Sequence, residues 1–217
     1  MAAGATRAFA SSGATRPVAR AVALVSLGLA AALPAAAQVE RYAVDPGHTT
    51  PGFAVTHLGI STQRGRFERT TGRIELDRER GAGRIEIDIE TASVSTGNRA
   101  LDAVLKGEDF FDSQRHPRIA FRSAEVDFEA GVPRRARGEL TLAGRTQPVT
   151  LAIERFGCTR LPFFVRTTCG ADATAAIRRS AFGLSAWSGF VGDEVRLEIQ
   201  VEAIREEPAA EPAVPGG

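Results

Sequence analysis

A strict alternation of apolar and polar residues constrains the fold of this chain more than any other feature of its sequence. Residues 195–202 read Val-Arg-Leu-Glu-Ile-Gln-Val-Glu, residues 85–90 read Ile-Glu-Ile-Asp-Ile-Glu, and residues 149–154 read Val-Thr-Leu-Ala-Ile-Glu. Successive side chains of a β-strand point to opposite faces, so each segment has one apolar face and one wet face. Parallel sheets are covered on both faces, and the pattern therefore predicts antiparallel strands in an all-β fold.

Turn residues separate these segments at short intervals. Asp77–Gly83 contains two glycines, Gly131-Val132-Pro133 interrupts one pair of strands, and Ala143-Gly144-Arg145 forms a tight hairpin. Short strands separated by such turns indicate a sandwich or a barrel.

One segment departs from the strand pattern. Asn98 is a good N-cap for a short helix that ends at Gly107, and Glu108–Asp112 are expected to add a helical turn before Pro117. The apolar residues of this insertion either plug one end of a barrel or simply cover a core. They are Leu101, Leu105, Phe110 and Phe111.

The first 37 residues have the three parts of a secretory signal peptide. Arg7, Arg16 and Arg20 precede an apolar stretch from Ala21 to Leu33, and an Ala-x-Ala site follows. The stretch of 13 residues is too short for a helix that crosses about 30 Å of hydrocarbon. We therefore expect export, with cleavage between Ala37 and Gln38.

The rest of the chain divides into a domain and a tail. Residues 38–205 suit a single domain, and residues 206–217 contain little to bury and are expected to be disordered. The net charge is +1 and the charges are interspersed, which gives no electrostatic footprint for nucleic acid.

The two cysteines, Cys158 and Cys169, both lie in the part expected to be exported. Two spaced thiols in an oxidising compartment most simply form a disulfide, and the C-x-x-C spacing of a redox pair is absent. We expect the bond to staple a strand that ends at Gly157 to one that begins near Val165, with Leu161-Pro162 at the turn.

The sequence gives little support for catalysis or metal binding. Its histidines, His48, His57 and His116, lack the spacing of a helical metal-binding pair, so structural or surface roles are favoured. Asp109 and Asp112 lie near His116 and could do acid–base work, but capping and turn roles explain them equally well. No nucleophile accompanies them, and we expect no enzyme and no metal site.

A series of short motifs in a fixed order covers nearly the whole expected domain. These motifs are Tyr42–Pro46, His48, Phe53–Gly59, Gly65–Phe67, Gly72–Ile74, Thr96–Asn98, Asp109–Asp112, His116–Pro117, Gly138–Gly144, Arg179–Leu184 and Val191–Val195. Their order resembles the YceI-like family, the polyisoprenoid-binding proteins of bacteria.

The resemblance implies a periplasmic protein with a lipocalin-like, eight-stranded antiparallel β-barrel and a short helical insertion at Asn98–His116. It also implies that the barrel holds a long isoprenoid chain, often that of a quinone. Arg178 and Ala181 depart from the residues common in the family, which leaves head-group specificity open. Pro51-Gly52 suggests a bulge or an unpaired edge before Phe53.

Alternation and the resemblance together give a candidate cavity lining. Arg179 could meet a polar head group at the mouth, although an ion pair on the outer surface explains it more simply. The expected lining consists of Phe53, Val55, Phe67, Ile87, Leu101, Leu105, Phe110, Phe111, Phe121, Leu140, Leu142, Leu151, Phe182 and Trp187.

Three functions remain at this point. The first is a lipid carrier with a non-covalently bound polyisoprenoid, and the second is a filled barrel that serves as a periplasmic interaction or stress-response module. The third is an enzyme that uses Asp109, Asp112 and His116. Transient contact with a membrane or a membrane protein stays open, as does the choice between a monomer and a homodimer.

Overall fold

The computed structural model describes residues 39–160 and 166–207. The expected signal peptide, the Leu161-Pro162 turn and residues 208–217 of the expected tail lie outside the described residues. No helix within these two ranges is long and apolar enough to cross a membrane.

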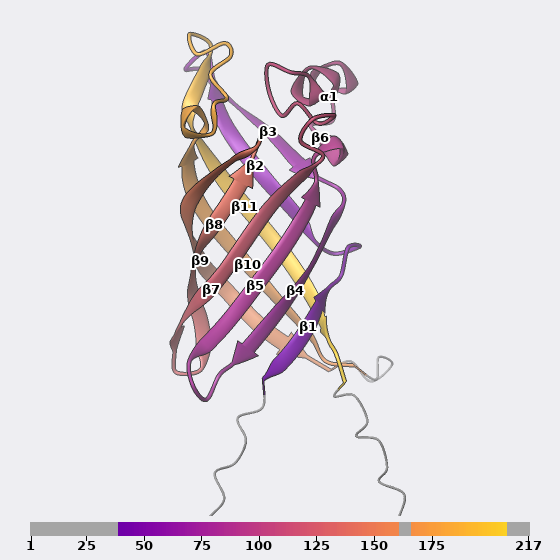
Figure 1. Ribbon diagram of the computed structural model, residues 1–217, viewed down its shortest axis with the longest axis vertical. Helices are drawn as coiled ribbons and strands as arrows, with labels where there is room; N and C mark the ends of the chain where they lie inside the picture. Colours follow the sequence, from indigo (N-terminus) through magenta and orange to yellow (C-terminus); the bar gives the residue numbers. More distant parts are fainter. Residues whose placement is uncertain (1–38, 161–165, 208–217) are drawn as a thin grey trace, which may run out of the picture. The chain divides into compact units, whose positions relative to one another are not determined.

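The described residues are mostly β-strand (Figure 1). The strands are β1 (Glu40–Val44), β2 (Thr50–His57), β3 (Ser61–Phe67), β4 (Thr70–Asp77), β5 (Ala82–Glu90), β6 (Val94–Ser95), β7 (Arg118–Glu129), β8 (Val132–Leu142), β9 (Arg145–Thr159), β10 (Thr168–Arg178) and β11 (Val191–Arg205). The helices are α1 (Arg99–Lys106) and two 3₁₀ segments, η1 (Thr91–Ser93) and η2 (Arg179–Phe182).

The sheet closes on itself through β11. The strand order β1-β4-β5-β7-β8-β9-β10-β11 forms a ring of antiparallel neighbours, because β11 pairs with β10 on one side and with β1 on the other. Strands β2, β3 and β6 continue the wall at one end, where β2 pairs with the first part of β11. The eight-stranded antiparallel barrel predicted from the sequence is confirmed.

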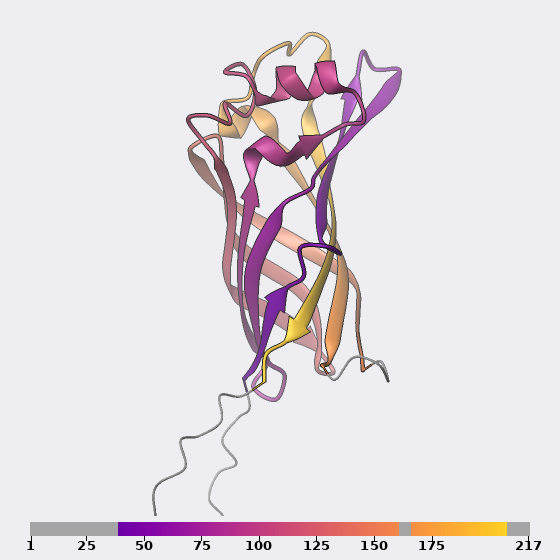
Figure 2. The same cartoon turned by 90° about the vertical axis from the view of Figure 1, so that its right-hand side faces the viewer.

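The two ends of the barrel differ. One end, here called the helix-covered end, carries α1, the β2–β3 turn at residues 58–60 and the loop at residues 183–190 (Figures 1 and 2). The other end, here called the turn end, carries the β4–β5 and β7–β8 turns and the start of β1.

The wall is interrupted between β1 and β2, at Asp45–Thr49. Both strands pair with β11, and the buried Thr49 side chain fills the break between them. Its hydroxyl donates to the carbonyl of Glu202 at 3.1 Å and accepts from the amide of Glu202 at 3.1 Å, so it replaces a missing backbone partner. The irregularity expected before Phe53 is therefore present but earlier, since Pro51 lies in register opposite Ile199.

A small polar turn shapes the same interruption. Asp45 accepts from the Gly47 amide at 2.9 Å and pairs with His48 Nδ1 at 2.8 Å. The hydrogen bond from His48, followed by that from the Gly47 amide, lowers the pKa of Asp45, and the Asp45 carboxylate raises the pKa of His48.

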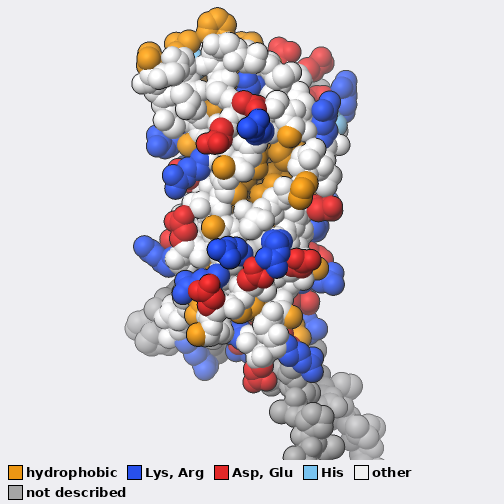
Figure 3. Space-filling model, turned by 90° about the vertical axis from the view of Figure 1, so that its left-hand side faces the viewer, with side chains coloured by type: hydrophobic (Ala, Val, Ile, Leu, Met, Phe, Trp, Pro, Cys, Tyr) orange, Lys and Arg blue, Asp and Glu red, His pale blue; other side chains and the backbone are white. Residues whose placement is uncertain are grey.

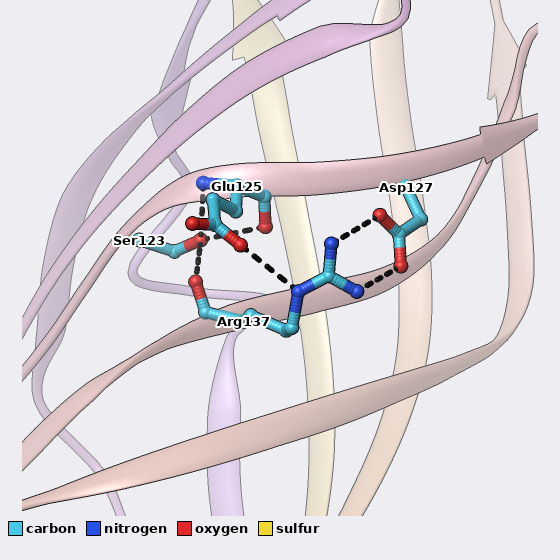
Figure 4. Close-up of polar contacts among 4 residues, drawn as sticks. All are labelled: Ser123, Glu125, Asp127 and Arg137. Carbon is cyan, nitrogen blue, oxygen red and sulfur yellow. Dashed lines mark hydrogen bonds and ion pairs between the residues drawn. The ribbon is translucent and has the colours of Figure 1, made fainter.

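A bulge in β7 is held by a polar cluster that joins the buried Ser123 to the solvent-accessible groups of Glu125, Asp127 and Arg137 (Figure 4). Ser123 is opposite Gly138 and Glu125 is opposite Arg137, which leaves the residue between them unpaired. The Ser123 hydroxyl donates to the Arg137 carbonyl at 2.7 Å, while the Arg137 guanidinium donates to Glu125 and to both carboxylate oxygens of Asp127. The cluster thus fixes the bend of the strand without using any lumen side chain.

The predicted disulfide is confirmed. Cys158 of β9 and Cys169 of β10 lie directly opposite each other and are bonded. Strand β9 runs to Thr159, beyond the expected end at Gly157, and β10 begins at Thr168.

The helix of the insertion begins and ends as predicted, with Asn98 as its N-cap and Gly107 as its C-cap. The side chain of Asn98 accepts from the amides of Ala100 and Leu101, which confirms it as the N-cap of α1. The helical turn expected at Glu108–Asp112 is wrong. Gly107 is in extended backbone and Asp112 has φ of 44°, so this segment forms hydrogen-bonded turns instead.

The role of Thr49 gives the first prediction. Thr49→Val keeps the side-chain shape but leaves the partly buried Glu202 amide without its partner, so the free energy of unfolding should fall by about 1–3 kcal/mol. Urea denaturation of the two proteins measures the difference. Thr150→Val, at an exposed position of β9, is the matched control and should change stability little. Equal losses in the two variants would contradict this account of the wall.

A candidate lipid cavity inside the barrel

An elongated cavity of about 510 Å³ lies inside the barrel. On β11 its lining runs from Val191 to Val201. Ten residue steps with a rise of about 3.3 Å each, on strands tilted by about 40°, correspond to roughly 25 Å along the barrel axis. Its length suits a slender chain better than a compact molecule.

Strand register explains why the lining is apolar. Ile87 lies opposite Phe121, and Phe121 lies opposite Leu140, so these three side chains share the inner face across β5, β7 and β8. Phe53 lies opposite Gly65, where a Cβ atom would come within 2.4 Å of the Phe53 ring. A glycine at this position therefore gives Phe53 the room to lie across the lumen.

Most of the side chains predicted to line a cavity do lie in its lining. Phe182 is the exception: it is 2% exposed and packs in the hydrophobic core outside the lining, because η2 ends the two-residue alternation before this position. The predicted residues found in the lining are Phe53, Val55, Phe67, Ile87, Leu101, Leu105, Phe110, Phe111, Phe121, Leu140, Leu142, Leu151 and Trp187.

Sequence reasoning missed about two thirds of the lining. Several missed residues continue alternating runs that were already visible, while others are small residues with no such signal. The first kind includes Ile85, Val149, Ile153, Val195, Leu197, Ile199 and Val201, and the second includes Ala136, Ala171 and Ala173.

Aromatic rings narrow the lumen toward the helix-covered end. The rings of Phe53, Phe67 and Phe111 lie 5.6–6.1 Å apart, and the Phe110 ring lies 5.8 Å from that of Trp187 in an edge-to-face arrangement. The helical insertion therefore contributes side chains to the cavity as well as covering it. On the face shown in Figure 3, hydrophobic side chains are also visible within a hollow of the molecule.

A second, smaller hydrophobic cluster lies toward the turn end of the barrel. Tyr42, Leu76, Cys169 and Ala203 form a buried cluster there. Outside it, Glu40 pairs with Arg78 at 3.0 Å and with Arg205 at 3.5 Å, and accepts from the Tyr42 hydroxyl at 3.0 Å. Burial, followed by the hydrogen bond to Glu40, raises the pKa of Tyr42.

Arg179 does not form the expected ion pair on the outer surface. It is 6% exposed, and its guanidinium donates to the backbone carbonyls of Leu184, Ala186, Val191 and Gly192. A guanidinium has five N–H groups, so these four bonds leave little capacity for a head group. Arg179 contacts the cavity but mainly holds the loop that precedes β11.

Asp193 holds the other side of the same loop. Its carboxylate accepts from the Ser180 amide at 2.9 Å and from the Ser180 hydroxyl at 3.0 Å. These bonds, the backbone one first, lower the pKa of Asp193.

Three polar side chains in the lining were missed by sequence reasoning. His57 and Gln63 both line the cavity, and the register places them on the same face as Val55. Asn98, the N-cap of α1, also contacts the cavity. The alternation of β2 and β3 could have predicted His57 and Gln63, because both occupy inward positions of these strands.

The residues considered for acid–base chemistry lie outside the lining. Asp112 pairs with Arg115 at 3.3 Å, Asp109 is exposed, and His116 packs beside Gly144. Within residues 39–160 and 166–207, no group of three or more His, Cys, Asp or Glu side chains could hold a metal ion.

Comparisons with known proteins agree with this geometry. Residues 42–203 match the sequence profile of the YceI-like domain. A UPF0312 protein of Photorhabdus laumondii is 32% identical over 169 residues, which cover 76% of this chain and 87% of that protein. The YceI protein of Campylobacter jejuni is similar in structure, with a TM-score of 0.60 and 26% identity over 70% of this chain and 90% of that one.

A further similar structure is a polyisoprenoid binding domain from Saccharophagus degradans. It has a TM-score of 0.55 and 14% identity, and the alignment covers 76% of this chain and 98% of that one. At this identity the likeness shows the fold alone. The match to the YceI-like profile, however, spans most of the chain, and the protein therefore belongs to the YceI-like family.

Proposed function

We propose that this protein binds a long-chain polyisoprenoid lipid, quinone-like or another isoprenoid derivative, inside the barrel and carries it without chemical change. The observation that supports this proposal is the elongated cavity inside the barrel, with its almost wholly apolar lining. The Saccharophagus degradans domain, a polyisoprenoid binding domain of the same fold, supports the class of ligand.

Burial of hydrocarbon supplies the binding energy in this proposal. Each methylene-sized group moved from water into such a lining contributes about 0.8 kcal/mol. Association and chain ordering remove on the order of 10 kcal/mol, so a chain of several isoprene units leaves a surplus. The polar side chains of His57, Gln63, Arg64 and Asn98 also line the cavity and can contact a head group.

The cavity also weighs against the two alternative functions. The interior of a filled barrel would be close-packed, with few voids larger than a water molecule, and a cavity of about 510 Å³ does not fit that description. An enzyme would need reactive groups that converge on the lumen, but Asp109, Asp112 and His116 do not line it.

We also propose that the protein acts in the periplasm. The signal peptide expected at residues 1–37 supports this location, and the Cys158–Cys169 disulfide suits an oxidising compartment. N-terminal sequencing of protein from the periplasmic fraction should therefore begin at Gln38. Met1 at the start of the folded protein would contradict export with cleavage.

Affinity should rise with the length of the isoprenoid chain and depend only weakly on the head group. Titration of delipidated protein with isoprenoids of increasing length, followed by thermal shift, measures both effects. The midpoint should increase stepwise until the chain fills the cavity. No stabilisation at any length would leave a filled or differently used barrel as the better interpretation.

Filling the lumen should block binding without unfolding the barrel. Ala173 lines the cavity and is 5% exposed, so Ala173→Phe should weaken binding of the longest isoprenoid about tenfold or more while the unliganded protein keeps its melting temperature. Ala152→Phe is the matched control, because Ala152 is exposed on β9 between the lining residues Leu151 and Ile153. Equal affinities in both variants would place the ligand outside the lumen.

A further inference from the structure

Large apolar side chains are exposed almost entirely at one end of the molecule. Of the six most exposed in the described residues, Leu58, Ile60, Val104, Trp187 and Phe190 lie at the helix-covered end, and Val39 lies at the turn end. Ile60 is 84% exposed and Phe190 is 60% exposed. Figure 3 shows hydrophobic side chains gathered at this end.

Four of these side chains lie on two adjoining loops. The Leu58 amide donates to the Phe190 carbonyl at 2.7 Å, and the Phe190 amide donates to the Trp187 carbonyl at 2.8 Å. We call Leu58, Ile60, Trp187 and Phe190 the mouth patch. The patch borders the cavity directly, since His57, Trp187 and Val191 are lining residues.

The backbone of the mouth patch is unfavourable for the residues that it carries. Leu58 has φ of 54° and Trp187 has φ of 56°, a left-handed region that bulky side chains rarely adopt. The other non-glycine residues with positive φ in the described chain are Asp112, Ala130 and Ala143, which are smaller. Leu58 and Trp187 are therefore both strained and exposed. Neither property stabilises the fold, which points to a function for these residues.

The two loops carry no ionic group. Residues 57–63 and 183–192 contain no Asp, Glu, Lys or Arg, although these residues make up 24% of the chain. Immersion of the loops in an apolar medium would therefore desolvate no charge. The β4–β5 turn at the turn end contains Arg78, Glu79 and Arg80, whereas the charges of the helix-covered end lie on and beside α1, outside these two loops.

We propose that the mouth patch docks the barrel on a lipid bilayer, with the cavity mouth facing the acyl chains. The proposal rests on the proposed function, because a hydrocarbon ligand needs a path that avoids water. Trp, Phe, Leu and Ile are the residues that enter the boundary between head groups and acyl chains, to a depth of about 5–10 Å. Arg64 is exposed on β3 behind this tip and lies at head-group level.

The single tryptophan of the chain, Trp187, reports docking directly. Vesicles of phosphatidylcholine and phosphatidylglycerol should shift its fluorescence to the blue. Lipids brominated near the head group should quench the emission more strongly than lipids brominated at the bilayer centre. An unchanged spectrum together with no cosedimentation would overturn the proposal.

Paired variants separate the patch from the rest of the molecule. Ile60→Ser/Phe190→Ser should reduce cosedimentation with the vesicles about tenfold or more, because it removes two of the apolar groups that enter the bilayer. Val39→Ser, at the turn end and 42% exposed, should bind as the parent does. All proteins compared carry the same N-terminus, so undiminished binding of the double variant would overturn the proposal.

Two further measurements distinguish docking from lipid binding. The Ile60→Ser/Phe190→Ser variant should still be stabilised by isoprenoid added from solution, whereas Ala173→Phe should still dock on vesicles. If added isoprenoid stabilises neither the parent nor either variant, the proposed function is refuted. Docking is then judged by the vesicle data alone. Self-association of the parent that the double variant abolishes, without vesicle binding, would identify the patch as a dimer interface and refute docking.

Discussion

The pairing of β11 with both β10 and β1 is the constraint on which the rest of the structure depends. A closed sheet has no exposed edge, and closure gives every alternating strand one face in the lumen and one in water. The 15 residues of β11 also exceed the length of β1, so β2 pairs with the remaining part. The break at Asp45–Thr49 follows from this arrangement, and the Thr49 hydroxyl restores the hydrogen bonds there.

Closure alone does not decide whether the barrel is hollow. An eight-stranded barrel is just wide enough to be filled by its own side chains or to hold one slender ligand. Small inward residues favour the hollow barrel. Ala136, Ala171 and Ala173 face the lumen, while Gly65 makes space for the Phe53 ring. The alternating pattern is the same in a filled and a hollow barrel, and so the size of the inward residues carries the functional information.

The sequence predicted the architecture better than the site. Alternation, turn residues and the order of the motifs were enough for the barrel, and the Asn98 cap and the Cys158–Cys169 bond followed from local chemistry. Arg179 and Phe182 were misplaced because η2 interrupts the alternation and the loop at residues 183–192 folds back onto it. The four backbone carbonyls that accept from Arg179 are brought together by the tertiary structure, and no pattern in the neighbouring residues predicts them.

The difference between the two ends gives the cavity a direction. At the turn end, Tyr42, Leu76, Cys169 and Ala203 form a buried cluster, and Glu40 forms ion pairs with Arg78 and Arg205 beside it. At the helix-covered end, by contrast, the lumen is bounded by Phe110 and Trp187, whose rings touch but belong to different segments of the chain. Separation of these rings requires movement of a loop and not rupture of the strand ladder. The end of the lumen that is bounded by loop side chains is thus also the end where most of the large exposed apolar side chains lie.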